Sequence, residues 1–288
     1  MRLAFDSGPM RLQCGRHTLN LDIPVVMGVL NVTPDSFSDG GRFADLPAAL
    51  AQAERLAGEG AAIIDVGGES TRPGAASVDV DEELRRVIPV IERLVGRLAV
   101  PVSVDTSKPE VMRAAIAAGA SMINDVMALR APGAIDAVAE SGVALCLMHM
   151  QGEPRTMQKE PRYKDVLAEV RDFLCGRVAF CVEAGISVSR LVIDPGFGFG
   201  KTLEHNLELL RRLPELAADG YPVMAGLSRK SMIGKLTGRT DGERLGGSLA
   251  LATLAVLSGA RIVRAHDVAP TVDAIRIVAA MGGRHGGS

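Results

Sequence analysis

The stretch VPVSVDTSKPEVMRAAIAAG, residues 100–119, contains one complete strand–helix unit of this chain. Its first part is apolar and rich in valine, which is typical of a parallel strand buried on both faces. Pro109 and Gly119 bracket an alanine-rich segment, and helices prefer proline at the start and glycine just past the end. The polar cluster DTSKP lies between the two. The stretch therefore predicts a buried strand, a polar turn at its carboxyl end, and a helix that runs back.

The same unit recurs along the whole chain of 288 residues. The eight apolar runs are VVMGVLNV from Val25, AAIIDVGG from Ala61, VPVSVDT from Val100, ASMINDV from Ala120, VALCLMHM from Val143, RLVIDPG from Arg190, YPVMAGLS from Tyr221 and ARIVRAHD from Ala260. Helical patterns cover residues 46–60, 80–99, 109–119, 163–185, 203–213 and 270–281, and residues 245–260 predict a buried helix.

Eightfold strand–helix alternation favours an α/β fold of the closed (β/α)₈ TIM-barrel type over an open sheet. Such barrels commonly take about 250 residues as one unit. Before the first run, residues 10–22 predict a small hairpin around Gly15 and Arg16 that plugs the amino end of the barrel. No linker interrupts the pattern, so we expect one domain over residues 1–288.

The composition of the chain limits the kinds of partner that it can bind. The net charge is −2, from 32 basic and 34 acidic residues, and no basic block occurs. This balance argues against binding to nucleic acid or to an anionic membrane. No apolar signal-peptide core is present near the N-terminus, and residues 245–260 are too short to span a bilayer. Cys14, Cys146, Cys175 and Cys181 have no metal-ligand spacing, which predicts free thiols in a reducing compartment. We expect a cytoplasmic protein that acts on small molecules.

Unusual polar clusters follow the strands at their carboxyl ends. They are NVTPDSFSDGG (31–41), GGESTRPG (67–74), DTSKP (105–109), ND (124–125), HMQG (149–152), DPGFGFGK (194–201), SRKS (228–231) and RAHD (264–267). Barrel enzymes keep their active sites on this face. The distribution therefore predicts an enzyme active site at the barrel mouth.

Structural explanations remain open for several of these residues. Asp105 is placed to help cap the next helix, although Ser107 is the better-placed N-cap. Asn124-Asp125 and Asp194-Pro195 also suit ordinary turns. His149 fits a buried core position.

Two other features favour a binding site. Arg264 and His266 are two residues apart on a strand, so both face the mouth. The glycine-rich GFGFGKT is not a Walker A loop, because Pro195 stands where that motif needs glycine, and no GxGxxG opens the first unit. We expect these glycines to let backbone approach a flat ligand, with Phe197 and Phe199 as apolar walls.

Together the clusters resemble the dihydropteroate synthases of the pterin-binding barrel family. The matching stretches run in the family's order: MGVLNVTPDSFSDGG, DVGGESTRPGA, VSVDTSKP, INDV, MHMQG, DPGFGFGK, GLSRKS and VRAHD. One departure is Ala265, where we expect a larger apolar residue facing away from the mouth. The resemblance implies a homodimeric enzyme of folate biosynthesis. It would condense a dihydropterin-CH₂-O-pyrophosphate with p-aminobenzoate and release pyrophosphate.

The resemblance also implies a role for individual residues. Pterin binding is expected from Asp105, Asn124, Asp194, Lys230 and Arg264, and pyrophosphate binding from Thr71, Arg72, Arg264 and His266. Aminobenzoate is expected among Phe37, Pro73, Phe199, Lys230 and Ser231, a Mg²⁺ at Asn31, and catalysis from Asp105, Lys230, Arg264 and His266. A carboxylate accepts paired pterin N–H groups, and a guanidinium stacks on the ring. The expected displacement is dissociative, with the C–O bond breaking before the amine attacks.

The sequence leaves two alternative functions open and predicts an order in which the substrates bind. A pterin-binding methyltransferase domain would share the Asn and Asp contacts but needs no NVTPDSF, STRPG or RxH cluster. A paralogue that binds pterin without catalysis is the second alternative. Residues 32–45 and 67–80 are long for barrel connections, so we expect pyrophosphate and Mg²⁺ to order them before aminobenzoate binds. Sulfonamides, as aminobenzoate mimics, are expected to compete for that pocket.

Overall fold

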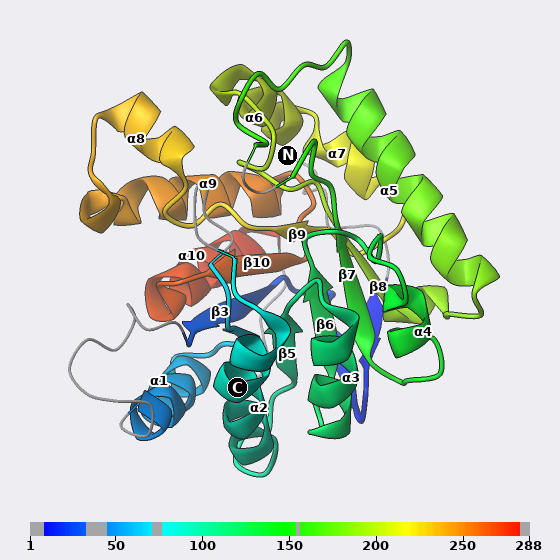
Figure 1. The fold of residues 1–288 in the computed structure, drawn as a ribbon. Coiled ribbons are helices and arrows are strands. Elements are labelled where there is room, and N and C mark those ends of the chain that lie inside the picture. The colour runs from blue at the N-terminus through cyan, green and yellow to red at the C-terminus, as the bar shows by residue number, and fades with distance from the viewer. Residues whose placement is uncertain (1–8, 33–44, 71–76, 154–155, 283–288) are drawn as a thin grey trace.

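The computed structural model describes residues 9–32, 45–70, 77–153 and 156–282. Eight parallel strands form one sheet in the order β8-β7-β6-β5-β4-β3-β10-β9. They are β3 (Val25–Asn31), β4 (Ile63–Gly67), β5 (Val102–Asp105), β6 (Met122–Asp125), β7 (Ala144–Met148), β8 (Leu191–Asp194), β9 (Met224–Ala225) and β10 (Ile262–Ala265). A parallel bridge between Ile193 and Val223 joins the two edges of the sheet. The sheet therefore closes into a barrel, and the predicted (β/α)₈ fold is confirmed (Figure 1).

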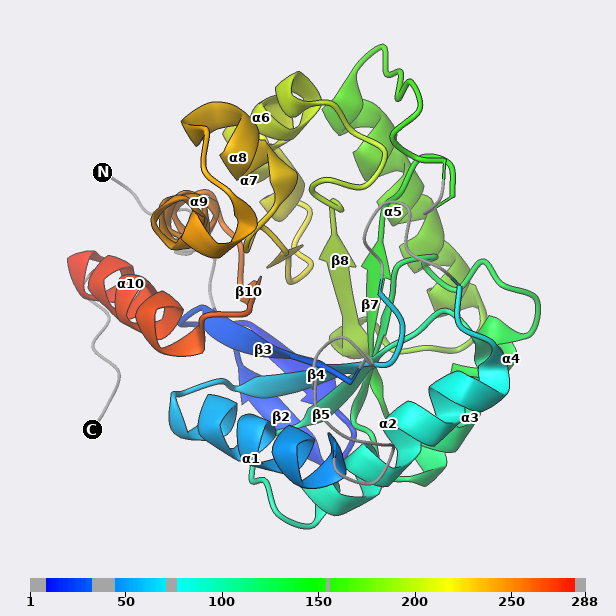
Figure 2. The same cartoon turned by 60° about the vertical axis from the view of Figure 1, so that its left-hand side comes forward.

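Helices surround the barrel, as the view in Figure 2 shows. They are α1 (Asp45–Gly58), α2 (Val80–Val95), α3 (Pro109–Ala117), α4 (Ala134–Val138), α5 (Val166–Glu183), α6 (Leu203–Arg211), α7 (Leu213–Ala217), α8 (Ser231–Thr237), α9 (Leu245–Leu257) and α10 (Val268–Met281). The 3₁₀ turns are η2 (Val188–Arg190) and η3 (Asp241–Glu243). The sequence missed α4 and α7, because helices of five residues are too short to show a 3.6-residue period.

Two details of the helices differ from expectation. Ser107 is not the N-cap of α3; the cap residue is Lys108, which has no side-chain cap bond. Instead the Thr106 hydroxyl accepts from the Lys108 N–H at 3.3 Å. The helix over residues 245–260 is also not buried throughout. Leu245 and Leu254 on α9 are 43% and 49% exposed, although the helix packs against α10 and α8.

Side chains alternate across each strand, and this alternation separates the core into two regions. Val102 and Val104 of β5 pack outward in the large cluster beneath the helices, whereas Ser103 and Asp105 point into the barrel. Ala265 belongs to the same outer cluster, so it faces away from the mouth as expected, next to the inward-facing Arg264.

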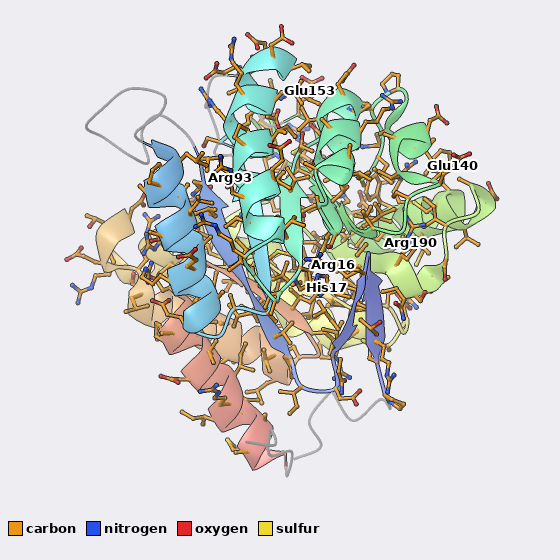
Figure 3. All side chains as sticks on the ribbon, turned by 90° about the horizontal axis from the view of Figure 1, so that it is seen from below. Arg16, His17, Arg93, Glu140, Glu153 and Arg190 are labelled. Carbon is orange, nitrogen blue, oxygen red and sulfur yellow. The ribbon has the colours of Figure 1, made fainter. Side chains whose placement is uncertain are left out.

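The hairpin of β1 (Arg11–Cys14) and β2 (His17–Asn20) closes the amino end of the barrel. Leu12 and Cys14 are fully buried there against inward-facing barrel residues such as Met27 and Ile63. The Arg16 guanidinium donates to the Val95 carbonyl at 2.7 Å. Figure 3 shows this side of the molecule, with Arg16 and His17 at the turn of the hairpin. The predicted plug is confirmed.

The four cysteines are all free thiols, as the sequence predicts. No helix in the described part of the chain has both the length and the apolarity to cross a membrane.

Candidate active site

A hydrogen-bonded network centred on Arg264 occupies the barrel mouth. The Arg264 Nε donates to Oδ2 of Asp65 at 2.7 Å, and its Nη2 donates to Oδ2 of Asp105 at 2.8 Å. The Asn124 amide donates to the same Asp65 oxygen at 3.0 Å. These side chains come from four different strands, β10, β4, β5 and β6, because every inward-facing position near a carboxyl end meets the same space. The structure thus brings together Asp105, Asn124 and Arg264, which the sequence predicted, around Asp65, which it left without a role.

Asp65 is fully buried, and its Oδ1 has no hydrogen-bond partner among the described residues. Asp65 lies opposite Ser103 in the register of β4 with β5. The buried Ser103 hydroxyl also has no hydrogen-bond partner within the described chain. Buried polar groups without partners are rare, and they occur mainly where function requires them. The signal in the sequence was a single acid inside the apolar run AAIIDVGG.

The pKa of the Asp105 carboxyl is raised far above its ordinary value. Burial raises its pKa to about 7; the Arg264 guanidinium opposes the rise, and the Asp65 and Glu83 carboxylates add to it. A buried carboxyl that titrates near neutrality beside a fixed cation is typical of functional sites.

The structure divides the residues of the ND cluster by role. Asn124 points into the barrel, whereas Asp125 accepts from the backbone N–H groups of Met127 and Leu129, both at 2.7 Å. Asp125 is therefore the turn residue that the sequence left open, and Asn124 belongs to the site.

Asp194 ends β8 on the opposite side of the mouth. Its Oδ1 accepts from the Gly196 N–H at 2.7 Å, so the turn interpretation and the site interpretation both hold. Burial raises its pKa, while that N–H and the Lys230 and Lys201 ammonium groups oppose the rise. Burial also lowers the pKa of Lys230 to about 8.

Lys230 and Phe199 meet at the site. The Lys230 Nζ lies 4.1 Å from the centroid of the Phe199 ring, a cation–π distance. The Lys230 methylenes lie against Gly198, because a Cβ added there would come within 3.3 Å of the lysine Cδ.

The glycine-rich loop after β8 packs on protein backbone rather than lying open for a flat ligand. Gly196 and Gly200 have φ of +67° and +61°. A Cβ on either would overlap a carbonyl oxygen of the 149–151 segment. The expectation for Phe197 was wrong: its side chain is 1% exposed in the outer core, whereas Phe199 turns toward the mouth. A left-handed glycine between the two aromatic residues sends them in different directions.

His149 is a buried core residue, as the sequence favoured. Its Nδ1 lies 3.0 Å from the Nζ of Lys201, and its ring meets Phe173 edge-on at 5.0 Å. Burial lowers the pKa of His149 to about 3, so its ring is neutral. Lys201 is a second buried residue that sequence reasoning missed.

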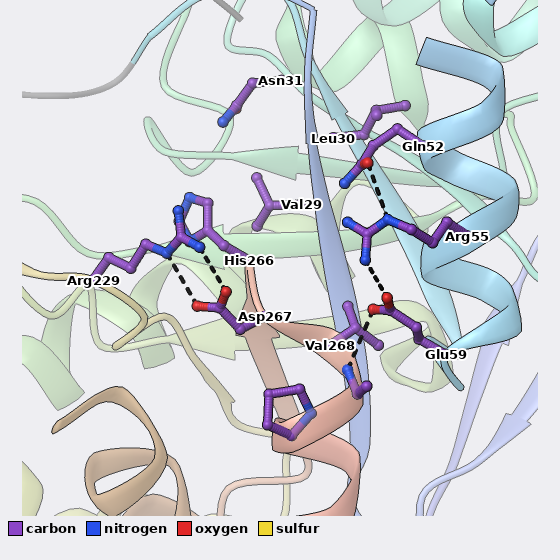
Figure 4. Close-up of a pocket in the computed structure, with 12 residues that line it drawn as sticks. Val29, Leu30, Asn31, Gln52, Arg55, Glu59, Arg229, His266, Asp267 and Val268 are labelled. Atoms are coloured by element: carbon purple, nitrogen blue, oxygen red, sulfur yellow. Dashed lines mark hydrogen bonds and ion pairs between the residues drawn. The ribbon is translucent and has the colours of Figure 1, made fainter. Parts of the chain in front are cut away.

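His266 and Asn31 lie at the edge of the mouth, in a cleft of about 470 Å³ (Figure 4). The His266 backbone N–H donates to the Ser228 hydroxyl at 3.2 Å, and its Nδ1 lies 3.0 Å from the same oxygen. Beside them the Arg229 guanidinium donates to both Asp267 oxygens, at 3.0 and 2.6 Å. Positively and negatively charged side chains thus both line this cleft.

Around Asn31 the described chain offers one amide oxygen and the open space beside Gly67. A Cβ added at Gly67 would lie 3.7 Å from the Asn31 Oδ1 and 3.8 Å from the Asp105 Cβ, so the glycine leaves room between these two side chains. No cluster of three or more His, Cys, Asp or Glu suited to a metal occurs in the described ranges. A single amide oxygen suits Mg²⁺, which takes waters and phosphate oxygens at its other positions.

Four predicted site residues, Phe37, Thr71, Arg72 and Pro73, lie outside the described residues. Ser231 is the first residue of α8, exposed, and follows Lys230 directly.

Comparison with known proteins identifies the family of this chain. The model of the pterin binding enzyme family matches residues 27–266. A dihydropteroate synthase of Escherichia coli K12 is 54% identical over 271 residues, which are 94% of this chain and 96% of that protein.

Two solved structures are similar over nearly the whole chain. Dihydropteroate synthase from Xanthomonas albilineans with 4-aminobenzoic acid has a TM-score of 0.90 and 57% identity, and the match covers 95% of this chain and 98% of that one. The Burkholderia cenocepacia enzyme complexed with 7,8-dihydropteroate has a TM-score of 0.88 and 51% identity, with 96% and 97% covered. The chain therefore belongs to the pterin-binding enzyme family and, within it, to the dihydropteroate synthases, transferases of folate biosynthesis.

Proposed function

We propose that the barrel mouth binds dihydropterin pyrophosphate with its ring over Arg264 and joins it to p-aminobenzoate at the outer edge. The observation that carries the proposal is the convergence of Asp105, Asn124, Asp194 and Lys230 around one fixed guanidinium. A pterin needs both acceptors and donors along its edge, and these side chains offer both kinds.

Asp194 accepts the paired N–H groups of the pterin. Its Oδ1 is already fixed by the Gly196 N–H, and within the described chain its Oδ2 receives no donor. Asn124 contributes its amide oxygen and its second N–H, because the first N–H is bonded to Asp65. Lys230 donates to the pterin oxygen from its position over Phe199.

The charges of the site favour a dissociative displacement. Three buried carboxyl groups, those of Asp65, Asp105 and Asp194, line the mouth and can stabilise positive charge that develops there. A positive charge that develops on the pterin methylene as the C–O bond breaks is stabilised there by preorganised groups. An aryl amine needs no strong base to attack such a centre.

The leaving group is held at the other side of the mouth. We assign the pyrophosphate to His266 and Arg264, with Thr71 and Arg72 from the sequence. Mg²⁺ at Asn31 would supply charge neutralisation for the departing phosphate oxygens. The protein holds His266 ready for this through Ser228.

Aminobenzoate takes the outermost position. The Phe199 ring and the Lys230 methylenes form one wall, Phe37 and Pro73 are proposed to form the other, and Ser231 receives the carboxylate. Two copies of the chain are proposed to pair. Support comes from exposed apolar side chains on α9 and α10, where Leu254, Ile277 and Met281 are 49%, 64% and 70% exposed.

The test is release of pyrophosphate from dihydropterin pyrophosphate in the presence and absence of p-aminobenzoate, with dihydropteroate measured in the same samples. We expect equal amounts of both products, only when aminobenzoate is present. Pterin binding without product would support the non-catalytic paralogue. Methyl transfer from a methylated folate to a corrinoid, without pyrophosphate release, would support the methyltransferase.

A further inference from the structure

Lys201 has a buried amino group with a complete set of acceptors, and burial lowers its pKa to about 7. Its side chain is 2% exposed, and its Nζ donates to the carbonyls of Gly196 and Phe199, each at 3.0 Å. The Nδ1 of His149 lies at the same distance. The His149 carbonyl lies at 3.4 Å as a fourth acceptor, so protein acceptors take up all three N–H bonds that a lysine can offer.

Both carbonyls belong to residues that shape the proposed pterin pocket. The N–H of Gly196 holds the Asp194 carboxylate at 2.7 Å, and the ring of Phe199 lies under the Lys230 Nζ. Lys201 thus holds both ends of the four-residue segment 196–199, whose backbone orients one proposed pterin ligand and supports another.

The rest of the loop is held from its outer side. The Gly198 N–H donates to Asn206 at 2.7 Å, and its carbonyl accepts from Gln158 at 2.6 Å. The Tyr163 hydroxyl donates to the Gly200 carbonyl at 2.8 Å. Lys201 adds the contact to His149 on the inner side, beside the end of β7, and so links the loop to the neighbouring strand.

We infer that Lys201 is a positioning residue for the pterin pocket: it sets the orientation of Asp194 and Phe199 by holding their loop against His149. It does not touch substrate itself, because its three N–H bonds are taken by protein. Burying an ammonium group is costly, and the same loop contacts with a neutral side chain would avoid that cost. The inference rests on the proposed pterin role of Asp194.

The experiment measures the dissociation constant for dihydropterin pyrophosphate, KM, kcat and the melting temperature of Lys201→Met. Methionine keeps an unbranched apolar side chain as far as Cε and removes all three donors. The control is Lys235→Met, which removes an exposed lysine from α8. We expect pterin affinity to weaken at least tenfold in Lys201→Met, with KM rising more than kcat falls, and no change in the control.

A second pair of variants covers the case in which Lys201→Met does not fold. His149→Asn keeps an acceptor near the position of Nδ1, and His149→Leu removes it. The leucine variant should lose pterin affinity severalfold, and the asparagine variant should stay within about threefold of the wild type. Equal affinity in both variants would overturn the role of this contact.

Asp194→Asn is measured in the same series as the Lys201 and His149 variants. It separates the positioning role of Lys201 from the proposed pterin role of Asp194. A lower melting temperature for Lys201→Met with unchanged pterin affinity, while Asp194→Asn loses affinity, refutes the positioning role alone. Unchanged affinity in Asp194→Asn means that the pterin site itself was assigned wrongly.

Discussion

Replacing Asp65 tests whether the residues of the mouth are held in place from within the barrel. In Asp65→Ala the Arg264 guanidinium loses one of its two carboxylate partners, and the Asn124 amide loses its acceptor. Asp65→Asn keeps an amide oxygen for both donors but removes the charge. The two variants therefore separate the effect of the charge from that of the hydrogen bonds.

The magnitudes follow from the burial of the group. Asp65 is 0% exposed, and breaking a buried ion pair by removing one partner costs about 3–5 kcal/mol. Asp105 still holds Arg264 in the variant. We therefore expect Asp65→Ala to lower the free energy of unfolding by about 3 kcal/mol, the lower end of that range. Asp65→Asn exchanges charged for neutral hydrogen bonds, a difference of about 1–1.5 kcal/mol.

The assays are urea unfolding and kcat/KM for pterin pyrophosphate, with exposed Asp273→Ala on α10 as the control. We expect kcat/KM to fall about 100-fold in Asp65→Ala and about tenfold in Asp65→Asn, because each 1.36 kcal/mol is a factor of ten. If Asp65→Ala loses stability but keeps kcat/KM within threefold, Arg264 and Asn124 are oriented without Asp65, and the reasoning is refuted.

Four further predictions concern pH, pyrophosphate binding, inhibition and the order of binding. The log of kcat/KM against pH should be bell-shaped: activity falls as pH drops below about 7, where Asp105 is protonated, and falls again above about 8, where Lys230 loses its proton. An acid limb that survives in Asp105→Asn would contradict this assignment. His266→Ala should weaken binding of free pyrophosphate in calorimetry, whereas a purely structural role would lower the melting temperature and leave that affinity alone. Sulfonamides should inhibit competitively with aminobenzoate, and Ser231→Ala should change the two affinities unequally; non-competitive kinetics would move the pocket elsewhere. Aminobenzoate should bind measurably only when pyrophosphate and Mg²⁺ are both present, and equal heats without them would show a preformed pocket.

The barrel could be predicted because its signals are local and repeated. Each strand is an apolar run that ends in a polar cluster, and the two-residue period of a strand placed Arg264 and Ala265 on opposite faces correctly. The convergence of the strands' carboxyl ends predicted an active site at the mouth, and the resemblance to the dihydropteroate synthases grouped Asp105, Asn124 and Arg264, which the structure brings together.

Contacts between distant residues were the part that sequence could not supply. Asp65 is a lone acid in an apolar run, and only the closed barrel shows that it accepts from Arg264, 199 positions away in the chain. The GFGFGK loop looked like a surface for a flat ligand, but positive φ angles at its glycines fold it onto the 149–151 backbone and bury Phe197. Such backbone conformations depend on what the loop meets in the folded state. The extent of the domain and the roles of Phe37, Thr71, Arg72 and Pro73 stay predictions.

The most direct test of the central claim is a crystal structure of this protein with dihydropterin pyrophosphate and Mg²⁺. We predict that Asp194 accepts two N–H groups from the pterin edge, with Asn124 and Lys230 in hydrogen-bond contact and the guanidinium of Arg264 stacked on the ring. The pyrophosphate should lie against His266 with the metal at Asn31. A pterin bound away from Asp194, or a pyrophosphate that makes no contact with His266, would contradict the account.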